Sequence, residues 1–301
     1  MNLEVSIGHM RMKNPVTTAS GTFGYGGEYA GFVDLNMLGA VTVKGISLEP
    51  HRGNPPPRLY ETACGMLNSI GLQNVGLERF LKEKLPYLRR FDTKVIVNIL
   101  GGSIDEYCRL ASGLDGKVDA IELNVSCPNV KRGGIIFSSN THMLRSLIRE
   151  VRAVVKRSVL IVKLSPNSSD IVQHARISEA EGADAVSMIN TIAAMAIDIH
   201  TRKPRLSNII GGLSGPAIKP IGVRMVWEAH RSIGIPIVGM GGIMTAEDAI
   251  EYMLAGARAV SVGTANFVNP RATMEILEGI KSYMQTHGID DINKIIGGLI
   301  C

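Results

Sequence analysis

The chain has 301 residues, of which 45% are hydrophobic and 20% are charged, and its formal net charge is +5. This is the composition of a folded globular protein. The basic residues form no polybasic run, and no apolar stretch approaches the roughly 20 residues of a membrane span. We therefore expect a protein that binds neither nucleic acid nor membranes. The N-terminus has no signal-peptide pattern, which predicts a cytoplasmic location with reduced thiols.

Short apolar runs rich in valine and isoleucine alternate along the chain with longer amphipathic segments. Uninterrupted apolar runs are typical of parallel strands that are covered on both faces. The predicted strands are Val16–Gly21, Ala40–Gly45, Lys94–Leu100, Ala120–Val125, Val159–Leu164, Ala185–Asn190, Ile235–Gly239 and Ala259–Gly263. Amphipathic segments at 76–91, 141–158 and 245–257 predict helices, the last of them with Thr245 as its N-cap.

Eight strands that alternate with helices over about 250 residues predict an α/β protein with a closed (β/α)8 barrel, the TIM barrel. We expect residues 1–301 to form a single domain. A doubly wound open sheet is the alternative, but the first strand is not followed by a G-x-G-x-x-G pattern. Two stretches rich in proline and glycine, 49–74 and 198–220, predict long loops of the kind that often carry functional residues.

Polar residues stand near the carboxyl ends of most predicted strands, where the active site of such a barrel lies. Lys44 and Lys163 come late in otherwise apolar strands, and Asn98, Asn124 and Asn190 occupy similar positions in others. Taken singly, a lysine here is usually solvated and an asparagine usually forms a turn. Because they recur at the same end of successive strands, we predict that they surround a ligand.

Two glycine-containing turns follow the last two predicted strands, at Gly241-Gly242 and at Gly263-Thr264. Loops in these positions of a barrel often bind phosphate, because glycine lets the backbone approach and helix N-termini offer N–H donors. Glu122 is the only acidic residue near a strand end, which argues against a hydrolase triad and a divalent-metal site. Flavin mononucleotide (FMN), with a phosphate and an electron-accepting ring, fits these features best.

Six motifs together resemble the dihydroorotate dehydrogenase family: NVSCPN, ACGMLNSIGLQN, MINT followed by MAIDI, GGLSGPAIKP, GMGGI and VGTANF. The similarity covers essentially the whole chain and is greatest to the catalytic subunit of the heteromeric, NAD-linked class. It implies an FMN-dependent (β/α)8 barrel that oxidises dihydroorotate to orotate in de novo pyrimidine (UMP) biosynthesis. It also implies that Cys127 removes the proton from carbon-5 of the substrate while hydride leaves carbon-6 for the flavin, and that residues 129–140 form a lid.

The resemblance assigns two overlapping sets of binding residues and no metal ligand. The substrate set comprises Lys44, Asn68, Ser69, Ile70, Gly71, Leu72, Asn124, Asn190 and Thr191. The FMN set comprises Ser20, Lys44, Gly45, Asn98, Asn124, Lys163, Ile189, Gly215, Gly241, Gly242, Gly263 and Thr264. Lys44 is expected to act in catalysis beside Cys127 as the cation for the substrate carboxylate, and Lys163 to lie at the pyrimidine edge of the flavin.

The resemblance to the NAD-linked class also implies a partner, an electron-transfer subunit that carries FAD and a [2Fe–2S] cluster. Two catalytic and two electron-transfer subunits would form a heterotetramer. None of the four cysteines of this chain stands in a C-x-x-C pair, so we expect the cluster on the partner. The alternatives are a fumarate-linked single-chain dihydroorotate dehydrogenase, an FMN subunit like that of dihydropyrimidine dehydrogenase, and a non-catalytic phosphate-binding barrel.

Overall fold

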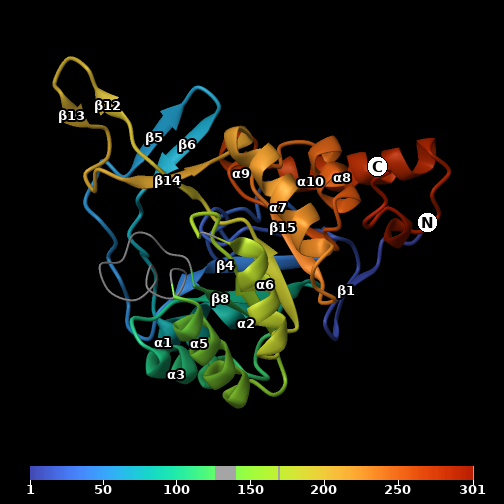
Figure 1. Ribbon diagram of the computed structural model, residues 1–301, viewed down its shortest axis with the longest axis horizontal. Coiled ribbons are helices and arrows are strands. Elements are labelled where there is room, and N and C mark those ends of the chain that lie inside the picture. Colours follow the sequence, from blue (N-terminus) through green and yellow to red (C-terminus); the bar gives the residue numbers. More distant parts are fainter. Residues whose placement is uncertain (126–139, 169, 301) are drawn as a thin grey trace.

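A computed structural model describes residues 1–125, 140–168 and 170–300 of the chain. At its centre lies a closed barrel of eight parallel strands in the order β10-β15-β16-β3-β4-β7-β8-β9 (Figure 1). These strands are β3 (Val16–Thr18), β4 (Ala40–Ile46), β7 (Lys94–Ile99), β8 (Ala120–Asn124), β9 (Val159–Lys163), β10 (Ala185–Met188), β15 (Ile237–Met240) and β16 (Ala259–Val262). The predicted (β/α)8 barrel is confirmed.

Each predicted strand is present, and the differences at the strand ends have local causes. The first strand stops at Thr18, before Gly21, whose φ of 92° is incompatible with an extended strand. The seventh begins at Ile237, because Pro236 has no N–H to donate to a neighbouring strand. The second continues to Ile46 through a shift in its register with β7 after Val43.

Helices surround the barrel, and their apolar faces pack on it to form one continuous core. They are α1 (Leu77–Arg79), α2 (Leu85–Leu88), α3 (Ile104–Leu114), α5 (Thr141–Val154), α6 (Ile171–Ala180), α7 (Lys219–His230), α8 (Ala246–Leu254), α9 (Ala265–Val268) and α10 (Ala272–Thr286). The predicted helix at 141–158 is α5. The predicted helix at 245–257 is α8, whose N-cap Thr245 forms a capping box with Asp248.

The predicted helix at 76–91 is interrupted. α1 is followed by a π-helical turn at Phe80–Lys84, and only then by α2. Pro86 lies in α2 and has no N–H to donate to the carbonyl four residues before it, so the regular α-helical pattern cannot run through this segment. No helix in the described residues is long and apolar enough to span a membrane.

Different structures close the two ends of the barrel. At the amino end lies the antiparallel hairpin of β1 (Val5–Ile7) and β2 (Met10–Met12), whose Gly8 is adjacent to Val159 and Asp184. At the carboxyl end lies an antiparallel sheet in the order β11-β14-β6-β5, which Figure 1 shows standing beyond the barrel. Its strands are β5 (Leu59–Thr62), β6 (Gly65–Asn68), β11 (Ile192–Ala194) and β14 (Gly211–Ser214).

The prediction that 49–74 and 198–220 are loops was therefore wrong for part of each stretch. β5 and β6 come from the first stretch, and β14 comes from the second, together with β13 (Lys203–Pro204), which pairs with β12 (Ile197–Asp198). The pairing of Leu67 with Leu213 joins residues far apart in sequence, so no local pattern reveals it. The resulting sheet covers the end of the barrel at which the polar residues gather.

Candidate active site

A pocket opens at the carboxyl end of the barrel, and every barrel strand contributes to its wall. The contributions lie at the last residues of the strands or directly after them, as expected for a TIM barrel. The sheet above the barrel supplies the remaining wall. The lining residues that come from or directly follow the barrel strands include Ser20, Lys44, Asn98, Asn124, Lys163, Asn190, Met240 and Thr264.

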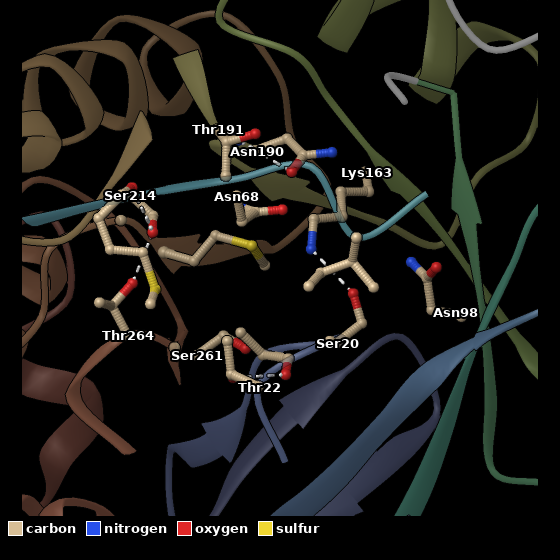
Figure 2. A pocket seen from close by; sticks show the side chains of 18 of the residues that line it. Ser20, Thr22, Asn68, Asn98, Lys163, Asn190, Thr191, Ser214, Ser261 and Thr264 are labelled. Carbon is tan, nitrogen blue, oxygen red and sulfur yellow. Dashed lines mark hydrogen bonds between the residues drawn. The ribbon is translucent and has the colours of Figure 1, made fainter. Parts of the chain in front are cut away.

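One end of the pocket holds a buried cation. Lys163, at the end of β9, is 4% exposed, and its Nζ donates a hydrogen bond to Ser20 Oγ at 3.1 Å. Glu122 Oε2 lies 3.9 Å from the same Nζ and provides the compensating negative charge. A buried ammonium group needs such a partner, because removal from water otherwise disfavours its charged form. Figure 2 shows Lys163, Ser20 and Asn98 together at this end.

Three asparagine amides connect this end of the pocket to its middle. Asn124 Nδ2 lies 3.4 Å from Asn98 Oδ1, and Asn190 Nδ2 lies 3.4 Å from Asn124 Oδ1. Asn98 is in β7 and Asn124 in the neighbouring β8, whereas Asn190 follows β10, which β9 separates from β8. The three amides meet at the carboxyl end of the closed barrel. Because amides both donate and accept, such a row suits a flat ligand whose edge alternates N–H and C=O groups.

Lys44 is placed by the irregular part of β4. Its Nζ lies close to Gly21, where an added Cβ would be 3.5 Å away. At Gly45 an added Cβ would lie 2.7 Å from Asn98 Oδ1, so only glycine lets the Asn98 amide stand where it does. The register shift in β4 thus brings a second cation and an amide to the same part of the pocket.

The opposite end of the pocket is formed by glycine turns and hydroxyl groups. Gly241 and Gly242 have φ values of 120° and 72°, and an added Cβ on Gly242 would lie 2.8 Å from the carbonyl oxygen of Gly215. Within the described part of the chain, the backbone N–H groups of Gly241, Gly242 and Gly263 donate to no other residue. Thr264 Oγ1 donates to Ser214 Oγ at 2.8 Å, and Figure 2 shows these two across the pocket from Lys163.

These groups fit FMN. N–H donors at turns without side chains accommodate a phosphate, and the buried cation and amides at the other end suit the polar edge of a flavin ring. The described residues bring together no group of three or more histidine, cysteine or acidic side chains of the kind that would hold a metal ion.

Comparison with known proteins places the chain in a family. A family model described as dihydroorotate dehydrogenase matches residues 2–284. The catalytic subunit of dihydroorotate dehydrogenase B (NAD(+)) from Alkaliphilus oremlandii is 58% identical over 299 residues, which is 99% of each chain. Proteins of the same name from Thermoanaerobacter sp. (strain X514) and Thermodesulfovibrio yellowstonii are each 57% identical, over 99% and 98% of both chains respectively.

The chain belongs to the dihydroorotate dehydrogenase family. The predicted family is thereby confirmed, and the chain is an oxidoreductase. Its pocket lies at the carboxyl ends of the barrel strands, where the predicted barrel led us to expect the active site.

Most residues assigned from the dihydroorotate dehydrogenase resemblance come together in this pocket. Those that line it are Ser20, Lys44, Gly45, Asn68, Ile70, Gly71, Leu72, Asn98, Asn124, Lys163, Ile189, Asn190, Thr191, Gly215, Gly241, Gly242, Gly263 and Thr264. Ser69 does not line it: the side chain is fully buried, since it follows Asn68 and alternates to the other side of the chain. Cys127 and residues 129–139 lie outside the described residues.

Several lining residues were not predicted. Leu59 and Met66 reach the pocket from β5 and β6, in a stretch predicted to be a loop, and Ser214 comes from β14 of the same sheet. Phe267 follows the second glycine turn and is half exposed. Ser214, Met66 and Phe267 all lie in motifs already singled out, but the apolar side chains among the unpredicted residues carry no chemical signal of a contact with a ligand.

Proposed function

We propose that this chain oxidises dihydroorotate to orotate in pyrimidine biosynthesis with NAD-linked electron transfer, the activity named for its relatives. One structural observation supports the proposal above all. A single pocket joins a buried lysine and a row of amides at one end to glycine N–H groups at the other, which have no hydrogen-bond partner among the described residues. This arrangement suits an elongated, phosphate-bearing cofactor together with a flat polar substrate.

The cofactor in this proposal is FMN, one per chain. When bound, it supplies the oxidant that accepts hydride from carbon-6 of the substrate. The turns at Gly241-Gly242 and Gly263-Thr264 would hold its phosphate. Lys163 and Asn98 would face the pyrimidine edge of its ring, where a fixed cation stabilises negative charge without reorganisation.

The substrate would lie against the amides on the same side as Lys44. Orotate and dihydroorotate carry a carboxylate, for which the Lys44 ammonium is the matching cation. Their ring N–H and C=O groups match the amides of Asn68, Asn124 and Asn190. Asn68 is held in place by a hydrogen bond from its Nδ2 to the carbonyl oxygen of Gly212, at 3.2 Å. Thr191, whose N–H donates to Asn190 Oδ1 at 2.9 Å, would line the same part of the substrate site.

Cys127 is proposed as the base, on the strength of the NVSCPN motif. Its Sγ would take the proton from carbon-5 of dihydroorotate. A free cysteine has a pKa of about 8.5, so the rate should rise with pH until the thiolate predominates.

An anaerobic reduction experiment tests the function. The purified chain is loaded with FMN, its flavin absorbance is recorded, and dihydroorotate is added. We expect bleaching in the wild type and none in Cys127→Ala, while dithionite bleaches both. Dihydrouracil, which lacks the carboxylate assigned to Lys44, should not bleach the wild type. A wild-type chain that dithionite bleaches but dihydroorotate does not would reject the substrate.

The partner in this proposal is an iron–sulfur flavoprotein with FAD and a [2Fe–2S] cluster, in a cytoplasmic heterotetramer of two plus two. The relatives' name, catalytic subunit, supports the existence of a partner. Co-expression with the partner chain should give one complex in size-exclusion chromatography, whose mass fixes the stoichiometry. Separate elution of the two chains at micromolar concentration would reject the complex.

A further inference from the structure

Glu122 is a buried carboxylate for which the proposed reaction has no step. It lies in β8, is 3% exposed, and does not itself line the pocket. Its Oε2 accepts a hydrogen bond from Asn98 Nδ2 at 2.6 Å, and its Oε1 accepts one from Ser187 Oγ at 2.7 Å. Removal of a carboxylate from water is costly even when it is paired, so stability alone gives little reason for a charge here.

The hydrogen bonds around Glu122 impose one direction on the Asn98 amide above it. An ionised carboxylate only accepts, so Asn98 must present its NH2 group to Glu122. Asn98 Oδ1 then faces Asn124 Nδ2, and Asn124 Oδ1 in turn faces Asn190 Nδ2. A reversed Asn98 amide would place its oxygen against the carboxylate. Glu122 therefore sets the direction of the Asn98 amide from below the pocket, while at the other end of the row Asn190 Oδ1 accepts a hydrogen bond from the N–H of Thr191.

Glu122 also compensates the charge of Lys163 without occupying its hydrogens. The 3.9 Å separation of Lys163 Nζ from Glu122 Oε2 is an ion pair but is longer than a hydrogen bond. The hydrogen bond that Nζ does make goes to Ser20, at 3.1 Å. The ammonium thus keeps donors for a ligand, while the field it exerts in the pocket is reduced by the carboxylate beside it.

We propose that Glu122 is a positioning residue of the active site. It orients the Asn98 amide and reduces the electrostatic field that the Lys163 ammonium exerts in the pocket. This inference rests on the proposed function, because FMN and orotate are the ligands that these groups would meet. Two properties should therefore depend on Glu122: the reduction potential of bound FMN, which responds to charge, and the affinity for orotate, which responds to the direction of the amides.

The test compares three variants of the FMN-loaded chain. In Glu122→Gln the charge is lost and the Asn98 amide can reverse, so the potential should shift to more positive values. Orotate should bind about 10- to 100-fold more weakly, the range known for residues that orient the ligands of a metal ion. Glu122→Asp keeps the charge, so the reduction potential of its bound FMN should be close to that of the wild type. Glu181→Gln is the matched control, because Glu181 pairs with Arg145 and Arg149 away from the pocket.

The readouts are the potential measured against a reference dye, orotate binding by the flavin difference spectrum, and the melting temperature. The control should lower the melting temperature and leave the first two unchanged. Wild-type values of both properties in Glu122→Gln, or equal changes in the control, would overturn the inference. If Glu122→Gln does not fold, Ser187→Ala decides, because it removes one of the hydrogen bonds that hold the Glu122 carboxylate. Unchanged orotate affinity in Ser187→Ala also overturns the inference. A wild-type chain that dihydroorotate does not reduce rejects the proposed function instead.

Discussion

Tyr252 places a hydroxyl group directly behind the glycine turn that follows β15. The side chain is fully buried on α8. Its Oη donates to the carbonyl oxygen of Gly241 at 2.8 Å, and the carbonyl oxygen of Met240 lies 3.2 Å from the same Oη. Burial raises the pKa of this hydroxyl, so it remains a donor at every physiological pH. Within a trans peptide, C=O and N–H point in opposite directions. Holding the two carbonyl groups toward Tyr252 therefore turns the N–H groups of Gly241 and Gly242 away from it.

Replacement of Tyr252 by phenylalanine should loosen this turn. We expect FMN to bind about tenfold more weakly and the chain to lose about 1 kcal/mol of stability, the typical contribution of one buried hydrogen bond. Fluorescence titration of the apoprotein measures the first effect, and urea unfolding measures the second. Tyr283→Phe, remote from the pocket, is the control. Riboflavin affinity should not change in Tyr252→Phe; an equal loss for riboflavin would contradict a role at the phosphate.

A methyl group at Gly242 should obstruct the same turn. The added Cβ of Gly242→Ala would stand 2.8 Å from the carbonyl oxygen of Gly215 and 2.8 Å from Lys219 Cβ, at a φ of 72°. We expect FMN affinity to fall at least about tenfold. Backbone strain should separately lower the free energy of unfolding by roughly 1–2 kcal/mol. Gly288→Ala separates the two effects, because Gly288 has a similar φ of 65° but no atom within 4 Å of the added Cβ. FMN affinity that falls equally in both variants would show that strain alone is responsible.

At the scale of elements, Asp115 joins the end of α3 to the start of β9. Its carboxylate accepts hydrogen bonds from the backbone N–H groups of Lys156, Arg157 and Ser158, at 3.0, 2.9 and 2.8 Å. Burial opposes ionisation of Asp115, but these hydrogen bonds outweigh it and lower the pKa of the carboxyl group below its usual 3.8. A lowered pKa means that the folded state binds the proton less readily than the unfolded chain does.

The stability that Asp115 contributes should therefore be present at neutral pH and disappear as the pH falls below about 4. Asp115→Asn keeps the amide oxygen for two of the three N–H groups but removes the charge. We expect the variant to be less stable than the wild type at neutral pH, with the difference shrinking towards about pH 3. Urea unfolding over this range measures it. A difference that does not change with pH would exclude the charge as its cause.

The strands of the barrel could be predicted because both of their faces are buried. All residues of β15 and of β9 are buried, so each appears in the sequence as an apolar run, which in β9 ends at Lys163. The sheet of β5, β6, β11 and β14 could not, since its short strands are half exposed and are held by pairings between distant segments. Local patterns record burial and capping but not which distant segment a strand will meet.

The same distinction explains what was found and missed at the candidate site. Lys44 and Lys163 stand out because a charge late in an apolar strand is unusual, and the barrel topology places such residues together. Leu59 and Met66 are ordinary apolar residues whose place in the pocket follows only from the sheet. Glu122 stands out in the sequence as an isolated acid, but the role proposed for it depends on contacts with β7 and β10 that no spacing reveals.

At the scale of the whole molecule, the pocket belongs to no single element. Residues at the ends of all eight barrel strands line it, and the sheet above adds a further side. A ligand in this pocket would therefore contact segments from Ser20 to Thr264, which span most of the chain. Unfolding of any of these segments would destroy the site, so binding should stabilise the fold as a unit rather than one part of it.

FMN should consequently raise the melting temperature of the entire chain in one transition. At a free concentration of 100 times its dissociation constant, a ligand that binds only the folded state adds about 2.7 kcal/mol. For a chain of this size each kcal/mol corresponds to roughly 1.5–2 °C, which gives an increase of about 4–5 °C. Scanning calorimetry of the apoprotein with and without FMN measures it.

Riboflavin at the same concentration should give a smaller shift, because it lacks the phosphate that the turns at Gly241-Gly242 and Gly263-Thr264 are proposed to hold. Equal shifts for the two flavins would show that the phosphate contributes nothing to the affinity. Two separate transitions would show that the barrel does not unfold as one cooperative unit.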